Sequence, residues 1–150
     1  MLRQRLTAEM KDAMKGGDKA KLATVRLIQA ALKDKDIEAR GLGKEPLADE
    51  EIFSLLQKMI KQRNESATVY DQGGRPELAE GERAEAAIIA QFLPQQMDED
   101  ETRAAIHAAI AETGAASQKD MGKVIAALKA AYAGRMDFAK ASALVKGMLS

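Results

Sequence analysis

The sequence predicts an all-α protein with an N-terminal four-helix domain, residues 1–94, and a small C-terminal three-helix bundle, residues 95–150. Apolar residues recur at helical spacing along nearly the whole chain, and no alternating run indicates a strand. The chain has only three prolines and is rich in residues that favour helix, such as Ala, Glu, Lys and Gln. Pro94 separates longer helical runs from shorter ones, so it marks the expected joint between the two parts.

Two helices are expected before residue 45. The first should end at Gly16-Gly17, because glycine is common just past the end of a helix. Asp18 is placed to cap the second helix, which the stretch RGLGKEP should terminate. The positions expected to be buried are Leu2, Leu6, Met10 and Met14 in the first helix and Leu22, Val25, Ile28 and Leu32 in the second.

A third and a fourth helix are expected before the joint. Asp49 is a candidate cap for the third, which should be roughly 35 Å long and close at Gly73-Gly74. Pro76 suits the first position of the fourth helix, and Pro94 should stop it. Their expected buried positions are Ile52, Leu55, Leu56, Met59 and Ile60, then Leu78, Ile88, Ile89, Phe92 and Leu93.

Three shorter helices follow the joint. Asp98 with Glu101 has the spacing of a capping box, and Gly114 should end the helix that begins there. Ser117 with Asp120 repeats this pattern for the next helix. Asp137 should cap the last helix, whose inward face carries Phe138, Ala141, Leu144, Val145 and Leu149.

Composition restricts the classes of function. The chain has no cysteine, which excludes disulfides and thiolate metal sites. The N-terminus MLRQRLTAEMKD lacks the apolar core of a signal peptide, and no window approaches 18 apolar residues. We therefore expect a cytoplasmic protein with no membrane partner.

Charge is unevenly distributed along the chain. Residues 1–44 carry 11 Lys/Arg against 6 Asp/Glu, residues 45–112 carry 6 against 15, and residues 113–150 carry 6 against 2. The net charge of zero argues against strong, indiscriminate nucleic-acid binding, but it allows a local basic patch.

No catalytic or metal-binding constellation stands out. His107 is the only histidine, and its place on an Ala/Ile-rich helix favours a half-exposed packing residue over a ligand. The acidic run from Asp98 to Glu101 is typical of caps and dipole partners in a first helical turn. We expect no catalytic residue, no metal and no cofactor.

Two stretches are candidates for binding. Lys58, Lys61 and Arg63 surround Met59 and Ile60 on the third helix, as either a cationic contact surface or a solvated face with long stems over apolar surface. The second stretch is SQKDMGKV, residues 117–124.

Three residues of that second stretch each cost stability near a helix start. Lys119 and Lys123 lie one turn apart near the positive helix end, and Gly122 costs about 1 kcal/mol relative to Ala. In one interpretation the exposed amides, the two ammonium groups and the flat glycine surface form a site for phosphate. In the other, Gly122 permits close helix packing and the lysines are tolerated surface.

The stretches SQKDMGKVIAAL and GRMDFAKASALVKGML closely resemble the C-terminal tail domain shared by YqeY-like proteins and the GatB subunit of bacterial tRNA-dependent amidotransferases. Upstream, TVRLIQAALKDKDIEAR and MIKQRNESATVYDQGGRPELAEGERAEAAIIAQFLPQQM are similar to the rest of a free-standing YqeY-like protein. The resemblance covers essentially the whole chain. It implies an all-α fold with an N-terminal helical domain and a GatB/YqeY tail-like C-terminal domain.

The resemblance also implies a function. The related tail domain helps amidotransferases hold tRNA, so RNA-backbone contact carries over to Lys119, Gly122 and Lys123. The label of carbon–nitrogen ligase with glutamine as amido-N-donor belongs to the larger enzyme, because its catalytic cradle and glutaminase subunit have no counterpart here. We therefore expect no catalysis by this chain alone.

Three functions remain open. The first is a non-catalytic helical module contacting tRNA or a tRNA-amidotransferase-like complex, with amidotransferase or other translation-related proteins as partners. The second is a protein-interaction adaptor that uses the acidic middle and the long helices. The third is an amidotransferase component that is active only with partner subunits. Because aromatics make up only 3% of the chain, RNA binding should depend on phosphate and shape rather than base stacking.

Overall fold

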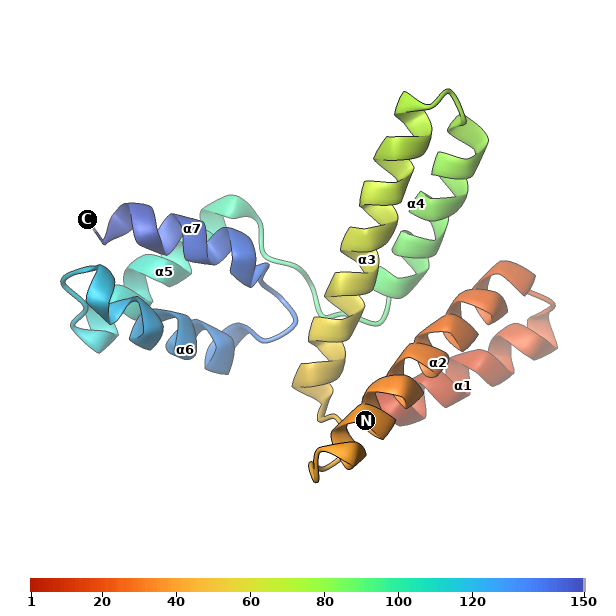
Figure 1. Cartoon of the computed structure of the whole chain (residues 1–150), viewed down its shortest axis with the longest axis horizontal. Helices are drawn as coiled ribbons and strands as arrows, with labels where there is room; N and C mark the ends of the chain where they lie inside the picture. Colours follow the sequence, from red (N-terminus) through yellow and green to blue (C-terminus); the bar gives the residue numbers. More distant parts are fainter. Residues whose placement is uncertain (150) are drawn as a thin grey trace. The chain divides into compact units, whose positions relative to one another are not determined.

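The computed structural model describes residues 1–149. These residues form seven α-helices and one short 3₁₀ turn, and no strand is present among them (Figure 1). The all-α expectation is therefore confirmed for the described chain. The α-helices are α1 (Leu2–Gly16), α2 (Lys19–Gly41), α3 (Asp49–Gln72), α4 (Pro76–Ala90), α5 (Glu99–Thr113), α6 (Met121–Tyr132) and α7 (Phe138–Met148).

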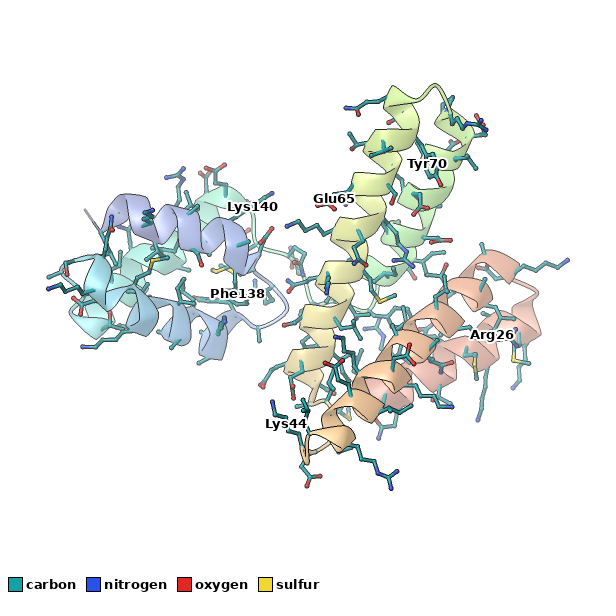
Figure 2. The ribbon with its side chains drawn as sticks, viewed as in Figure 1. Arg26, Lys44, Glu65, Tyr70, Phe138 and Lys140 are labelled. Atoms are coloured by element: carbon teal, nitrogen blue, oxygen red, sulfur yellow. The ribbon has the colours of Figure 1, made fainter. Side chains whose placement is uncertain are left out.

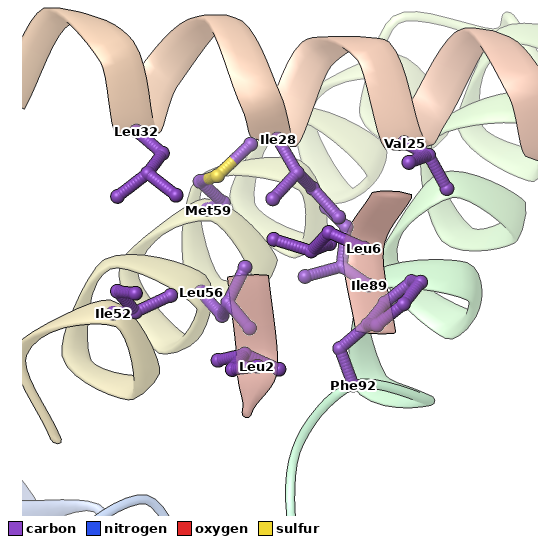
Figure 3. Close-up of a cluster of buried hydrophobic side chains, with 10 residues drawn as sticks. All are labelled: Leu2, Leu6, Val25, Ile28, Leu32, Ile52, Leu56, Met59, Ile89 and Phe92. Carbon is purple, nitrogen blue, oxygen red and sulfur yellow. The ribbon is translucent and has the colours of Figure 1, made fainter. Parts of the chain in front are cut away.

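The chain divides into two compact units, Met1–Leu93 and the part that begins at Pro94. In the first unit, α1 packs along α2 and α3 packs along α4, and α2 also contacts α3 and α4. Leucine, isoleucine and other apolar side chains from all four helices and the turn after α4 form one core (Figure 3). Its buried members are Leu2, Leu6, Val25, Ile28, Leu32, Ile52, Leu56, Met59, Ile89 and Phe92.

Helix ends in the first unit follow local capping chemistry. Gly17 ends α1 in the left-handed region at φ 70°, where a glycine has no Cβ to strain. The Asp18 carboxylate accepts a hydrogen bond from the Lys21 backbone amide, as expected. The expected cap at Asp49 is wrong by one residue: Ala48 takes the capping position, and its backbone N–H donates to the Glu51 carboxylate at 3.2 Å.

Helix α4 begins at Pro76, as its fixed backbone angle suggests. It ends at Ala90, earlier than Pro94, and continues as a turn through residues 91–93. Phe92 lies in this turn and is still buried, so the turn closes the core that the helix begins to cover.

In the second unit, α6 packs against both α5 and α7, and α5 also contacts α7. The Asp98–Glu101 capping box is present with both of its hydrogen bonds, and Asp137 accepts from the Ala139 and Lys140 amides. Gly114 ends α5 with a φ of 66°. The buried core comprises Ala105, Ile106, Ala109, Val124, Leu128, Met136, Ala141, Val145 and Leu149.

The segment before α5 is tied to the rest of this second unit. The Met97 amide donates to the Arg135 carbonyl oxygen at 2.9 Å, and the Arg135 guanidinium donates back to the Gln95 carbonyl oxygen at 3.0 Å. The side-chain amide of Gln96 also donates, through Nε2, to the Gly134 carbonyl oxygen. Residues 95–97 therefore belong structurally to the second unit.

Candidate functional site

The stretch from Ser117 to Val124 starts differently from the expected single helix. Gln118–Asp120 forms a 3₁₀ turn, and α6 begins only at Met121. The Ser117 side chain makes no capping hydrogen bond. Instead, the Asp120 carboxylate accepts the Ala116 backbone N–H at 3.0 Å, and it also interacts with the Ser117 amide. Of the two interactions in the expected capping box, the one from the Asp120 carboxylate back to the preceding backbone forms, because Asp120 reaches back over the tight turn. The one from the Ser117 hydroxyl does not form.

These contacts also set the ionisation of Asp120. The hydrogen bond from the Ala116 amide is the largest factor that lowers the pKa of the Asp120 carboxyl. The Ser117 amide and the charge of Lys123 lower this pKa further, while partial desolvation opposes them. The carboxylate is therefore occupied by the backbone, which limits how strongly it neutralises the lysine beside it.

The side chains of both lysines in this stretch are exposed to solvent. Lys119 is exposed and has no ion pair with any residue in the described part of the chain. The Lys123 ammonium lies 3.9 Å from an Asp120 oxygen, and its side chain is 69% exposed. A pair so long and so exposed contributes little to stability. Two nearly free cations therefore flank Gly122.

Gly122 does not make room for a packed neighbour. It is exposed, and a Cβ built on it meets no heavy atom within 4 Å. Its φ also lies outside the positive range that favours glycine. The interpretation that Gly122 permits close helix–helix packing is therefore wrong, and nothing in the described fold requires a glycine here.

The other candidate cations on α3 differ from one another. Arg63 is half-buried, and its Nε donates to the Glu85 carboxylate at 3.0 Å while Nη1 donates to the Met59 carbonyl oxygen at 3.2 Å. Lys58 and Lys61 are exposed and have no ion pair within the described residues. Arg63 joins α3 to α4, whereas the two lysines keep free ammonium groups.

The sequence did not predict two open grooves, one in each unit. The groove in the first unit has a volume of about 400 Å³ between the end of α2 and the start of α3, and Leu42, Lys44, Leu47 and Lys58 are among its lining residues. The groove in the second unit has a volume of about 460 Å³ and is lined in part by Arg135 and Lys140 (Lys44 and Lys140 are labelled in Figure 2). The first groove is lined by residues 35–58 of two consecutive helices and their connection, whereas the second joins residues 96–102 to residues 135–144. Each depends on how its segments fold against one another, which spacing along the chain does not show.

His107 is the only histidine of the sequence. His107 is exposed on α5 rather than half-exposed, and residues 1–149 contain no cluster of three or more side chains suited to holding a metal ion. Within the same residues, no helix is long and apolar enough to cross a membrane.

Comparison with known protein families identifies the family of this chain. The model of the family described as "Yqey-like protein" matches residues 3–149. This chain belongs to the YqeY-like family.

Relatives of this YqeY-like chain carry the name "Altered inheritance of mitochondria protein 41, mitochondrial". The protein from Pyrenophora tritici-repentis is 34% identical over 85 residues, which cover 57% of this chain and 45% of that protein. The protein from Meyerozyma guilliermondii is 36% identical over 88 residues, which cover 59% of this chain and 44% of that protein. The chain thus spans about half the length of the curated relatives it matches.

The names of these relatives contradict the expected cytoplasmic location, because they describe mitochondrial proteins. The expectation from composition failed for a physical reason. The absence of cysteine and of long apolar segments argues against a disulfide-stabilised secreted protein and against a membrane-spanning one. It does not separate one aqueous, reducing compartment from another.

Proposed function

We propose that this YqeY-like protein is a non-catalytic helical module that contacts the phosphate backbone of tRNA through Lys119, Gly122 and Lys123. The observation that carries the proposal is the open surface over Gly122, which no neighbouring atom approaches. A glycine that serves no packing role, between two cations with little or no pairing, suits the close approach of a phosphate to the backbone.

The architecture of this module is also a proposal. Residues 1–94 act as a four-helix domain and residues 95–150 as a three-helix domain of the GatB/YqeY tail type. Two separate buried cores support this division, one in each compact unit. Each core holds apolar side chains from every helix of its unit, as an independently folding domain requires.

A protein-interaction adaptor is the second candidate. The groove between α2 and α3 favours it, since its lining brings the 66% exposed Leu42 together with the half-buried Leu47 and Leu55. A role in a glutamine-dependent carbon–nitrogen ligase would require partner subunits to supply the nucleophile and the base. Such a complex could still use the Lys119–Lys123 surface for its tRNA.

The test is equilibrium binding of the purified protein to total tRNA at several salt concentrations. Phosphate contacts predict that log K falls linearly with log salt, by about 0.7–0.9 for each contact. Binding that is absent at low salt, or that does not depend on salt, contradicts the proposal. A protein partner recovered in the groove together with absent tRNA binding would favour the adaptor.

A further inference from the structure

Four cations recur at every seventh position of α2: Lys19, Arg26, Lys33 and Arg40. A seven-residue step is close to two helical turns, so the four side chains lie along one face about 10.5 Å apart. The row spans most of α2, about 32 Å from the first cation to the last. We call these four residues the α2 cation row (Arg26 is labelled in Figure 2).

All four side chains of the α2 cation row are exposed, and none has an ion pair in the described part of the chain. The acidic residues of α2 lie on other faces or are already engaged. Asp36 accepts two hydrogen bonds from Arg3, and Glu38 pairs with Lys35 at 3.4 Å. Asp34 lies about 100° around the helix from Lys33.

Small residues separate the cations of the row. Ala23 and Ala30 lie between them at helical spacing, both exposed, and Ile37 is the one large apolar residue at the equivalent positions. The opposite face of α2 carries Val25, Ile28 and Leu32, all buried in the core (Figure 3). The row therefore lies on the outward surface of α2, where Leu27 and Ile37 also remain 44% and 60% exposed.

The core explains the opposite face of α2 but not the row. Lys19 is the first residue of α2, where the helix dipole disfavours a cation, and the first turn contains no acidic residue. Arg40 lies in the last turn of α2, where the helix dipole favours a cation, but Lys19, Arg26 and Lys33 have neither this favourable position nor a counter-ion in the described part of the chain. A surface of this kind suits an extended polyanion that supplies the missing negative charge.

We propose that the α2 cation row binds the phosphate backbone of a nucleic acid along the length of the helix. A nucleic acid offers a linear, regularly charged chain over the required distance, and the alanines let that chain approach the helix surface. A membrane is the weaker match, because a helix that binds a bilayer needs a continuous apolar face. The large exposed apolar side chains of α2 are instead Leu27 and Ile37, ten residues apart and about 80° around the helix from each other. The row contains no aromatic residue, so it reads charge rather than base identity. This surface belongs to the first unit and shares no residue with the Lys119–Lys123 site, which belongs to the second unit.

The decisive variant replaces Lys19, Arg26, Lys33 and Arg40 with Gln, which has nearly the same helix propensity. The matched control replaces Lys44, Arg75, Lys140 and Lys146 with Gln, since these four exposed cations lie elsewhere and carry the same total charge. Circular dichroism verifies that both variants are folded. Total tRNA and a duplex DNA of about 30 base pairs are titrated at four salt concentrations, together with vesicles of mixed phosphatidylcholine and phosphatidylserine.

The row variant should bind tRNA at least about tenfold more weakly at low salt, with a salt slope reduced by about three. The control variant should lose much less affinity. Equal losses in the two variants, or no binding by the parent protein, would overturn the proposal. So would a row variant that loses vesicle binding while it keeps its affinity for both nucleic acids.

A third variant, Lys119→Ala with Lys123→Ala, keeps this inference distinct from the proposed function. Loss of affinity in the row variant alone supports the row and contradicts the Lys119–Lys123 site. Loss in the double-lysine variant alone supports the Lys119–Lys123 site and contradicts the row. Loss in both indicates that two surfaces of the chain contact the nucleic acid.

Discussion

The guanidinium of Arg63 joins two helices, because its Nε donates to Glu85 on α4 at 3.0 Å while Nη1 donates to the Met59 carbonyl oxygen on its own helix. Arg63→Gln should therefore lower the free energy of unfolding of the first unit by about 1 kcal/mol, a modest value because Glu85 is 40% exposed. Denaturant titration followed by circular dichroism measures the change.

The matched control for Arg63 is the pair Lys58→Gln and Lys61→Gln. Both lysines are exposed and unpaired within the described residues, so their loss should leave the unfolding free energy within about 0.5 kcal/mol of the parent protein. If Arg63→Gln is equally neutral, its ion pair does not stabilise the contact between α3 and α4. The interpretation of Arg63 as part of a cationic contact surface would then regain support.

Asp36 joins α2 to both α1 and the segment before α3. It accepts hydrogen bonds from Arg3 at 2.8 and 2.9 Å and from the Leu47 amide at 3.0 Å. The hydrogen bond from Arg3 is the largest factor that lowers the pKa of the Asp36 carboxyl. A lowered folded-state pKa adds stability above the unfolded value of about 3.9, and this stability is lost as the pH falls through the folded value.

Asp36→Asn should therefore cost about 1–2 kcal/mol at pH 7. The stability curves of the variant and the parent should begin to converge below about pH 4, where the unfolded chain takes up the proton first, and should meet once the pH has fallen through the lowered pKa of the folded Asp36 carboxyl. Denaturation midpoints between pH 2.5 and 7 test this expectation. A constant difference across the whole range would show that the carboxylate charge is not what stabilises this contact.

Two kinds of helix end were predictable from the sequence: N-caps with a side-chain hydrogen-bond acceptor, and C-termini that end at a glycine. Asp18, Asp98 and Asp137 each cap a helix as expected, and Gly114 ends α5. These signals act within four residues, so the chain alone contains them. The Asp49 and Ser117 predictions failed because a polar residue does not by itself fix where a helix begins: Ala48 takes the N-cap position of α3, and Ser117 precedes a 3₁₀ turn instead of α6.

The partners of the cations were not predictable in the same way. Sequence spacing showed Lys58, Lys61 and Arg63 as one group, but only the packing of α3 against α4 brings Glu85 to Arg63. Spacing also could not decide whether Gly122 packs against another helix or is exposed. That depends on whether another part of the fold lies against it, and none does among the described residues. The α2 cation row does carry a sequence signal, a cation at every seventh residue, but the apolar face of that helix gives the stronger pattern.

The hydrogen bonds of residues 95–97 to Gly134 and Arg135 predict where the chain can be divided. A fragment of residues 94–150 should fold alone, if the proposed domains are independent. A fragment of residues 98–150 should be less stable by about 2 kcal/mol, since it loses these bonds and the contact of Met97 with the core.

Thermal melting of the two fragments, followed by circular dichroism, measures this difference. For a domain of this size, the expected loss lowers Tm by about 8–16 °C. An unfolded 94–150 fragment would contradict the domain proposal. Identical melting of both fragments would leave the domains in place but show that residues 95–97 act only as a linker.

Gly122→Ala separates local helix stability from binding. The added methyl has open space around it, so Tm should stay the same or rise, with a gain of a few tenths to about 1 kcal/mol from helix propensity. Affinity for tRNA should fall, because the methyl holds a phosphate away from the backbone. A more stable variant with unchanged affinity would mean that the glycine has no role in binding.

The most direct test of the proposed function is the salt dependence of tRNA binding by Lys119→Ala/Lys123→Ala, beside the control Lys140→Ala/Lys146→Ala on α7. Removing Lys119 and Lys123 should leave stability unchanged or raise it by a few tenths of a kcal/mol, since both cations lie near the positive end of α6. The account predicts weaker binding and a salt slope lower by about 1.4–1.8, the equivalent of two phosphate contacts, in this variant but not in the control. A folded double-lysine variant with the affinity and salt slope of the parent protein would contradict it.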